Sequence, residues 1–416
     1  MPHENALHIF LAGPYSSEVA VDITRLLTEA RTRLFDMDLV LKHGCFAFSI
    51  LIDTCDRSGH FLDPQSGIGK NKLFDPLKNR AVHGNLLLEI QTVSSRDVSE
   101  TIIKSNRVVT CLGRPIESNA IHRICSILRE TGFEMHRIKT LARHSINCIE
   151  MTINAKEGAQ PDNLDRKLQK SAEKFGIDFA VQETDWNRRL KRLIIFDMDS
   201  TLSEIEVIDE LAKEAGVGDK VAGITKRAMN GELSFPEALR ERVGLLKGLS
   251  ENALATVYER MPYTPGVEKL FVFLKKLGIR TAVLSGGFDY FTSRVEKILG
   301  IDYSHSNRLE IENGVLTGRL IGDIVDGKKK VAFMEEMVRK EGITLAQVIA
   351  VGDGANDLPM IQRAGLGIAF DAKPTVRAKA PIHLSHRNLS LIPYFMGYTE
   401  EEIEAITGVE PSKIFN

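Results

Sequence analysis

The arrangement of apolar and polar positions changes near residue 185 and divides the chain into two unlike halves. In the first half, β-rich runs and helical patterns follow one another as two successive α+β units. In the second half, short apolar runs alternate with helical segments, and each run ends in small or polar residues. This alternation predicts a doubly wound parallel sheet with helices on both faces, preceded by two smaller domains.

The first unit is predicted to span residues 1–100 and to contain one long polar insertion. Its expected strands are His8–Ala12, Asp38–Lys42, Cys45–Thr54 and Leu86–Val93, with a helix after the first strand. Residues 55–85 are polar and contain Gly and Pro, and a loop of this length is usually functional or mobile. The fragment GIGKN within it lacks the glycine spacing and the Ser or Thr of a phosphate loop, so we expect no nucleotide site there.

The second unit, residues 101–185, repeats a similar order more clearly. Its expected strands are Arg107–Leu112, Met135–Leu141, Ile146–Ile153 and Phe179–Gln182. One helix ends at Gly132, and another runs from Asp162 to Gly176. The order strand, helix, two strands, helix, strand is the split βαβ plan of ferredoxin-like domains.

With Gly113 in the turn after its first strand, this second unit resembles the ACT domain. The first unit resembles it more weakly. The resemblance implies that the N-terminal half binds an amino-acid effector and pairs its sheets across a homodimer. The alternative is a ferredoxin-like domain that serves only dimerisation, and the sequence identifies no effector-binding residue.

Four apolar runs in the second half are predicted strands of one parallel sheet. They are Leu193–Phe196, Thr281–Leu284, Val348–Val351 and Leu366–Phe370. Ligands of such open sheets bind outside the carboxyl ends of the strands. We therefore expect the polar residues that follow these runs to meet at one edge of the sheet, although they are far apart in the chain.

Composition limits the class of protein further. The chain has 416 residues, of which 43% are hydrophobic and 26% charged, which excludes disordered and collagen-like classes. A formal net charge of −2 argues against a nucleic-acid partner, and no apolar run is long enough to span a membrane. Five cysteines without a C-x-x-C pair suit a reducing compartment, and the N-terminus has no signal-peptide pattern. We therefore expect a cytoplasmic location.

The first candidate chemical cluster begins at Asp197. A carboxylate at a strand end can attack phosphorus and form an aspartyl-phosphate, while Asp199 can lie on the same side and act as general acid and base. Two carboxylates beside a phosphate require a cation, and Mg²⁺ prefers oxygen ligands. Asp353 and Asp357, after the third run, supply further acids.

Two further clusters offer groups that hold phosphate. Ser285, Gly286 and Gly287 provide a hydroxyl and backbone amides, and residues 328–330 are three lysines. Each feature has an ordinary alternative, because D-x-D and S-G-G are often plain turns and a triple lysine is often the solvated start of a helix. Their occurrence at the ends of successive strands makes the combination more specific than its parts.

Three motifs, FDMDSTL, VLSGGFDYF and AVGDGANDLPM, resemble those of the haloacid dehalogenase superfamily, and within it the phosphoserine phosphatase family, over about residues 193–395. The resemblance implies that Asp197 is the nucleophile and that Asp199 is the general acid and base. It also implies a Mg²⁺ site formed by Asp197, the backbone carbonyl of Asp199, and Asp353.

The same resemblance implies which groups hold the transferring phosphoryl group. They are Ser285, the amide of Gly286 and one lysine, with Asn356 and Asp357 completing the last motif. Lys330 matches best by its distance to the following helix, and Lys329 remains an alternative.

The segment at about 206–262 is helical in pattern and is predicted to form a cap over the active edge. A turn signal at residues 313–314 predicts a hairpin flap at about 307–323. In the family that the motifs resemble, the cap carries a glutamate for the substrate amine, an arginine for its carboxylate, and an apolar lining. The matching positions are Glu206, Arg242, Met229 and Phe235.

The expected phosphatase domain, residues 186–416, would hydrolyse O-phospho-L-serine to L-serine and phosphate, the last step of serine biosynthesis. One alternative is a phosphatase or phosphotransferase for another small phosphoester, such as phosphohomoserine. Another is an amino-acid-sensing regulatory protein with a degenerate phosphatase half. This alternative is disfavoured because every expected catalytic position is occupied by the expected residue. Glu206 with Arg242 favours an amino-acid substrate over a sugar phosphate, since a planar guanidinium binds a carboxylate with two parallel hydrogen bonds.

Overall fold

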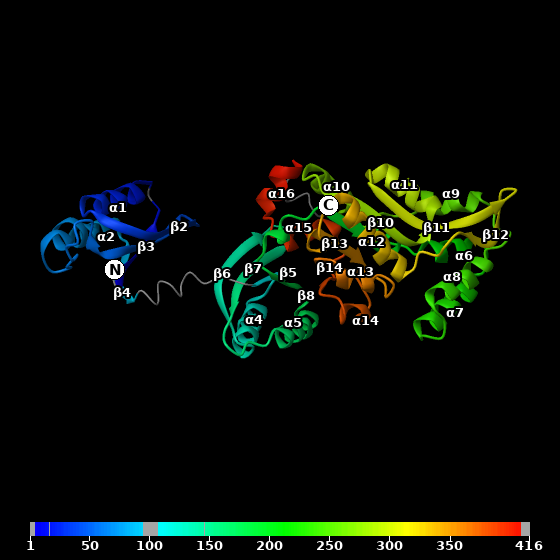
Figure 1. Cartoon of the computed structure of the whole chain (residues 1–416), viewed down its shortest axis with the longest axis horizontal. Helices are drawn as coiled ribbons and strands as arrows, with labels where there is room; N and C mark the ends of the chain where they lie inside the picture. The colour runs from blue at the N-terminus through cyan, green and yellow to red at the C-terminus, as the bar shows by residue number, and fades with distance from the viewer. Residues whose placement is uncertain (1–4, 16, 95–106, 145, 409–416) are drawn as a thin grey trace. The chain divides into compact units, whose positions relative to one another are not determined.

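The computed structural model describes residues 5–15, 17–94, 107–144 and 146–408 (Figure 1). The chain divides into two compact units, Met1–Lys104 and Ser105–Asn416. Within the described ranges, no helix is long and apolar enough to cross a membrane.

The first unit is a four-stranded antiparallel sheet covered by helices. Its elements are β1 (Asn5–Pro14), α1 (Ser17–Glu29), β2 (Thr32–Lys42), β3 (Cys45–Asp56), the π-helix Gly69–Phe74, α2 (Asp75–Gly84) and β4 (Leu87–Ser94). The strands lie in the order β2-β3-β1-β4. Ile23 of α1 and Leu77 of α2 are fully buried against Ile9 and Ile50, so alternate strand residues form the core.

The prediction that residues 55–85 form an inserted loop is wrong, because this stretch contains the second helix of the unit. Leu73, Phe74 and Leu77 are buried in the core, whereas the intervening residues are polar. Pro76 lies where α2 continues directly from the π-helix Gly69–Phe74, so a residue typical of helix starts and turns stands inside a helical stretch. The sequence pattern did not predict this helix because it has few apolar positions and contains a proline.

The second unit begins with a domain of the same plan. Its elements are β5 (Arg107–Gly113), α4 (Ser118–Glu130), β6 (Phe133–Ala142), β7 (Asn147–Ala155), α5 (Pro161–Phe175) and β8 (Ile177–Glu183). Their sheet order, β6-β7-β5-β8, corresponds strand for strand to that of the first unit. The ferredoxin-like order predicted for both units is therefore confirmed, and Gly176 ends α5 in the left-handed conformation that glycine favours.

The rest of the second unit is built on a seven-stranded sheet with the order β12-β11-β10-β9-β13-β14-β15. The strands are β9 (Leu193–Phe196), β10 (Arg280–Phe288), β11 (Tyr303–Glu312), β12 (Val315–Ile321), β13 (Val348–Gly352), β14 (Leu366–Phe370) and β15 (Ile382–Leu384). All neighbours are parallel except β11 and β12, which form the predicted hairpin. The strand order reverses between β9 and β13, where open α/β sheets bind their ligands.

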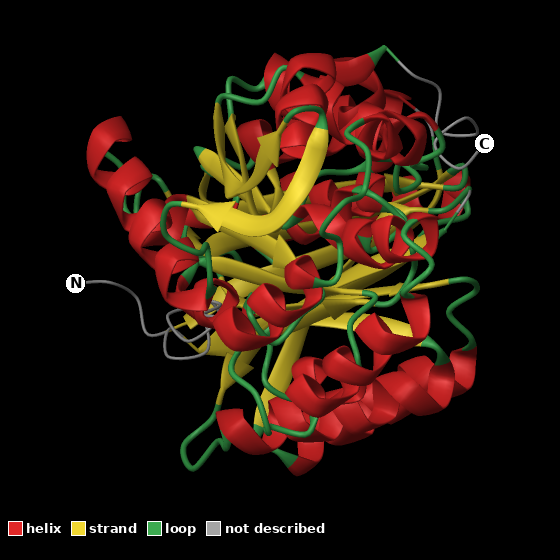
Figure 2. Cartoon of the chain, turned by 90° about the vertical axis from the view of Figure 1, so that its right-hand side faces the viewer, coloured by secondary structure: helices red, strands yellow, loops and turns green. Residues whose placement is uncertain are grey.

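Both faces of this sheet are buried, as predicted for a doubly wound fold (Figure 2). Ile194 and Phe196 of β9 pack toward α10 and α11, while Leu193 and Ile195 pack toward α12 and α13. Two apolar cores therefore fix the central strand from opposite sides.

Helices connect and cover the strands. Those in the predicted cap segment are α6 (Val207–Glu214), α7 (Gly218–Met229), α8 (Phe235–Gly244) and α9 (Asn252–Glu259). The others are α10 (Val267–Lys276), α11 (Asp289–Leu299), α12 (Gly327–Glu341), α13 (Leu358–Arg363), α14 (Pro374–Arg377), α15 (Ile392–Phe395) and α16 (Glu400–Thr407). The predicted domain boundaries at residues 100 and 185, and the limits of the cap, stay predictions.

Two buried carboxylates, Asp178 and Glu400, join the domain that contains β5–β8 to the rest of the second unit. Asp178 of β8 is fully buried and accepts hydrogen bonds from Ser385 and from the backbone and ring of His386. Glu400 of α16 is 2% exposed and lies 2.8 Å from Nδ1 of His144. These contacts hold the two domains of the second unit in one arrangement.

Candidate active site

Acidic residues from two distant segments meet where the strand order reverses. Asp197 directly follows β9, and Asp353 directly follows β13, its parallel neighbour. Carboxylate oxygens of Asp197, Asp353 and Asp357 lie within 4.8 Å of one another. The expectation that these segments meet at one sheet edge is therefore confirmed.

Lys330 connects two of these acids. Its side chain is fully buried, and its ammonium group lies 2.7 Å from Oδ1 of Asp197 and 2.6 Å from Oδ1 of Asp357. Lys329, the alternative left open by the sequence, instead pairs with the exposed Asp323. Asp326 caps the helix by accepting a hydrogen bond from the Lys329 amide, which fixes the first turn of α12 and directs Lys330 inward.

The carboxylates of the site repel one another in a desolvated environment. Burial and the neighbouring Asp357 raise the pKa of Asp197 to about 7, although Lys330 opposes this shift. Burial and nearby acids also raise the pKa of Asp199 and Asp353. Burial lowers the pKa of Lys330, but Asp197 and Asp357 overcome this effect and raise it.

This set of groups fits a divalent cation. Several buried carboxylates face one ammonium group, and hard oxygen ligands of this kind suit Mg²⁺. The acidic cluster includes Asp357 in place of the expected Asp199, whose predicted ligand is its backbone carbonyl. Asp357 also accepts hydrogen bonds from Lys330 and from the Gly354 amide, so both of its oxygens have protein partners.

The turn after Asp197 directs the chain from the sheet toward the cap. Ser200 has a φ of 56°, an uncommon conformation for a residue with a side chain. Its hydroxyl donates a hydrogen bond of 2.9 Å to Glu206. Asp199 accepts a weaker bond of 3.4 Å from the Val207 amide, at the start of α6. The turn therefore ties the acidic motif to the first cap helix.

The Ser285-Gly286-Gly287 segment reaches the same place from β10. Ser285 is fully buried, and its Oγ accepts a 2.8 Å hydrogen bond from the Gly287 amide. A Cβ on Gly286 would lie 2.6 Å from the Phe235 ring, and one on Gly287 would lie 2.7 Å from Oδ2 of Asp199. Only glycine permits this close approach of β10 to both the cap and the acids.

A pocket of about 120 Å³ brings together the acids and the expected substrate-binding residues of the cap. Its walls include Asp197, Asp199, Asp353, Glu206, Phe235, Arg242, Gly286 and Asn356. Burial raises the pKa of Glu206 and lowers that of Arg242, while each of the two charges partly opposes the shift of the other. Met229 ends α7, and its side chain lies outside what the structure describes.

Asn307 is a residue of this site that the sequence did not reveal. It is 3% exposed, and its amide donates a 2.8 Å hydrogen bond to the carbonyl of Gly286. Its carbonyl oxygen accepts a 2.8 Å bond from Val325, shortly before α12. Asn307 thus joins the segment of Ser285 to the segment that leads to Lys330, and no motif in the sequence marks this connection.

Comparison with known proteins identifies the class first. The model of the haloacid dehalogenase-like hydrolase family matches residues 194–362, and an ACT domain model matches residues 105–182. The predicted fold class is thereby confirmed. A haloacid dehalogenase family hydrolase of Salmonella enterica has a similar structure, with a TM-score of 0.61, 29% identity, and coverage of 70% of this chain and 98% of that one.

Curated relatives are more specific. A phosphoserine phosphatase of Mycobacterium tuberculosis is 34% identical over 97% of this chain and 96% of its own length. One of Archaeoglobus fulgidus is 54% identical over 54% of this chain and 65% of its own length. The chain belongs to the phosphoserine phosphatase family and is a phosphatase enzyme.

We predict that Asn307→Ala lowers kcat by about 10- to 100-fold and changes KM much less, because small displacements of positioned groups cost catalysis more than binding. Steady-state kinetics with a phosphomonoester substrate test this. Ser306→Ala is the matched control, because the neighbouring Ser306 hydroxyl pairs with Thr292. Equal kinetics for the two variants, or an unchanged kcat in Asn307→Ala, would contradict the positioning role.

Proposed function

We propose that the protein hydrolyses O-phospho-L-serine to L-serine and phosphate in a Mg²⁺-dependent reaction. The observation that carries the proposal is a single pocket that combines Asp197 and Asp199 with the oppositely charged Glu206 and Arg242. A phosphorylated amino acid has an amine and a carboxylate, which Glu206 and Arg242 complement, and a phosphate, whose charge Lys330 and a bound cation would balance. The family relationship supports the same substrate.

In the first step, a carboxylate oxygen of Asp197 attacks the phosphorus, and the bond from phosphorus to the serine oxygen breaks. Asp199, protonated at the start, gives its proton to the leaving oxygen. Burial and like charges raise the pKa of Asp199, which favours the protonated acid. The products of this step are L-serine and an aspartyl-phosphate at Asp197.

In the second step, Asp199 takes a proton from a water molecule, whose oxygen attacks the phosphorus. The bond between phosphorus and Asp197 then breaks, which releases phosphate and restores both carboxyl groups. Lys330 stabilises the negative charge on Asp197 and on the phosphoryl oxygens throughout. Ser285 and the Gly286 amide hold the phosphoryl group, beside Asn356 on the pocket wall.

We assign the Mg²⁺ ligands to Asp197, the backbone carbonyl of Asp199, and Asp353. When bound, the ion neutralises charge between these acids and the phosphoryl group. Asp357 positions Lys330 through their buried ion pair and is not assigned as a ligand.

The cap supplies the preference for an amino acid. Glu206 binds the substrate amine and Arg242 its carboxylate, with Phe235 and Met229 as the apolar lining. Closure of the cap excludes water and so strengthens these charge interactions. The ACT domain carries an amino-acid effector site and contributes to a homodimer in this proposal.

The substrate assignment predicts a strict order of activities. Phosphate release should be fastest from L-phosphoserine, and much slower from phosphohomoserine, phosphothreonine and a sugar phosphate. It should fall to background when EDTA removes Mg²⁺ and return when Mg²⁺ is added in excess. Preference for another ester would contradict the assignment of phosphoserine as the substrate. If the folded chain, supplied with Mg²⁺, hydrolysed none of these esters, a regulatory protein with a degenerate phosphatase half would be favoured.

We predict that Arg242→Ala lowers kcat/KM for phosphoserine by about 100-fold, because removing one partner of a buried charged pair commonly costs 2–5 kcal/mol. An aryl phosphate without a carboxylate should lose less than about 3-fold, because it makes no bond to Arg242. Arg240→Ala, an exposed change on the same helix, is the control and should match the wild type on both substrates. Equal losses on both substrates in Arg242→Ala would assign Arg242 a structural or catalytic role.

A further inference from the structure

A second pocket, of about 210 Å³, lies between the ACT domain and the phosphatase domain of the second unit. We call it the basic pocket and define it by Arg166, Lys170 and Glu173 of α5, Arg377 of α14, and His383 of β15. None of these residues belongs to the acidic site or to the cap. The pocket therefore forms a separate concavity, and both domains contribute to its wall.

The cations of the basic pocket are not neutralised by the protein. In the described part of the chain, neither Arg166, Lys170 nor Arg377 forms an ion pair, and Nε of Arg377 is buried without a hydrogen-bond partner. Arg166 and Lys170 are four residues apart on α5, so they lie on one helix face and repel each other. Arg166 and Lys170 are exposed to water, whereas the buried Nε of Arg377 has no hydrogen-bond partner, a cost that a hydrogen bond from its guanidinium group to a bound anion would offset.

The side chains that line the pocket carry an excess of two positive charges. Glu173 is the acid in the lining, against Arg166, Lys170 and Arg377. Burial lowers the pKa of His383, which is therefore neutral at pH 7. The buried carboxylate of Asp178 lies 3.9 Å from that ring and adds one negative charge just outside the lining.

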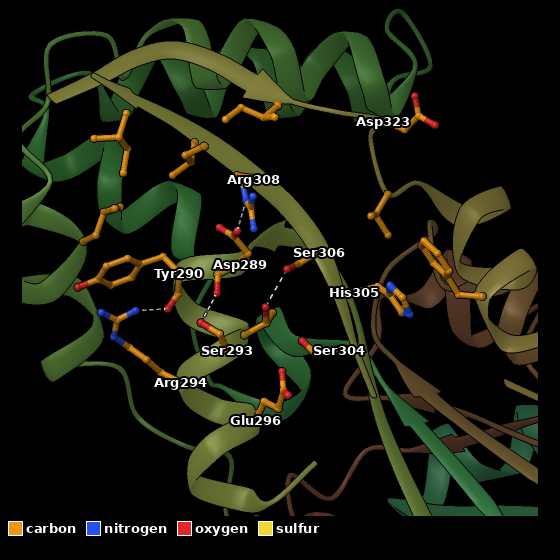
Figure 3. Close-up of a pocket in the computed structure, with 17 residues that line it drawn as sticks. Asp289, Tyr290, Ser293, Arg294, Glu296, Ser304, His305, Ser306, Arg308 and Asp323 are labelled. Atoms are coloured by element: carbon orange, nitrogen blue, oxygen red, sulfur yellow. Dashed lines mark hydrogen bonds and ion pairs between the residues drawn. The ribbon is translucent and has the colours of Figure 1, made fainter. Parts of the chain in front are cut away.

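A larger groove elsewhere in the second unit serves as a comparison for the basic pocket (Figure 3). It encloses about 720 Å³ between α11, the β11–β12 hairpin and α12. Its polar groups pair with one another, as in the 2.8 Å contact of Arg308 with Asp289 and the 2.7 Å bond between Thr292 and Ser306. Its lining carries the acids Asp289, Glu296 and Asp323 beside Arg294 and Arg308, so it lacks the positive excess of the basic pocket.

We propose that the basic pocket binds a small phosphate-bearing anion that bridges the ACT domain and the phosphatase domain. A phosphate-bearing anion matches the sign of this charge, and its oxygens can accept hydrogen bonds from the guanidinium groups of both domains. The pocket is large enough for inorganic phosphate or a phosphorylated amino acid, which are the expected product and substrate of the enzyme. The proposal rests on the unpaired cations and not on the reaction assigned to the acidic site.

The test compares anion-induced thermal stabilisation of three full-length proteins in the presence of Mg²⁺. They are the wild type, a pocket variant with Arg166→Gln and Lys170→Gln, and a control variant with Lys156→Gln and Lys174→Gln. The control removes the same charge from the same domain, outside the pocket lining. Because the acidic site is unaltered in all three, its own binding of anions contributes equally to each.

Inorganic phosphate should raise the melting temperature of the wild type and the control alike, and that of the pocket variant by less than half as much. A non-hydrolysable phosphonate analogue of phosphoserine is the second ligand, and a larger pocket-dependent rise than with phosphate would identify the substrate as the occupant. The same rise in all three proteins with both ligands would overturn the proposal. If both variants lost the same part of the phosphate-induced rise in melting temperature, the proposal would also be overturned, since that result indicates a general effect of charge. Arg166→Gln alone carries the test if the double variant proves unstable without ligand.

Discussion

The buried contact of Lys330 with Asp197 and Asp357 is the interaction on which the arrangement of the catalytic half depends. It joins the end of β9, the segment after β13 and the first turn of α12 at one fully desolvated ammonium group. Breaking one part of such a network leaves an uncompensated buried charge, which is strongly destabilising. The same contact partly offsets the repulsion among the acids around Asp197.

The cap is attached beside this centre, and the ACT domain is attached at the far edge of the sheet. Ser200 directly follows Asp199 in a strained turn, and its hydrogen bond to Glu206 ties the acidic motif to the start of α6. At the other end of the sheet, Asp178 binds the residues that follow β15. Shortly beyond them, Arg387 pairs with Asp371 and approaches Glu204, which lies in the segment leading to the cap. The two accessory parts therefore contact neighbouring stretches of the catalytic domain.

Sequence patterns were sufficient for features that depend on local periodicity or on strand ends. The buried strands β9, β13 and β14 and the middle of β10 are short apolar runs, and the acids that follow β9 and β13 could be placed together by the rule for parallel sheets. They were insufficient where tertiary contacts decide. Helix α2 carries too few apolar residues to stand out, and Asn307 acts through two backbone groups that are distant in sequence. The choice of Lys330 over Lys329 likewise required the helix cap at Asp326 to fix the direction of each side chain.

The central claim is that Asp197 carries the phosphoryl group during turnover. The most direct measurement is rapid acid quenching of the Mg²⁺-supplied enzyme with phosphate-labelled phosphoserine, followed by borohydride reduction and peptide mass spectrometry. The account predicts labelled protein during turnover and reduction at Asp197, with no label in an Asp197→Asn variant. Label at another residue, or full turnover without any labelled protein, would contradict the account.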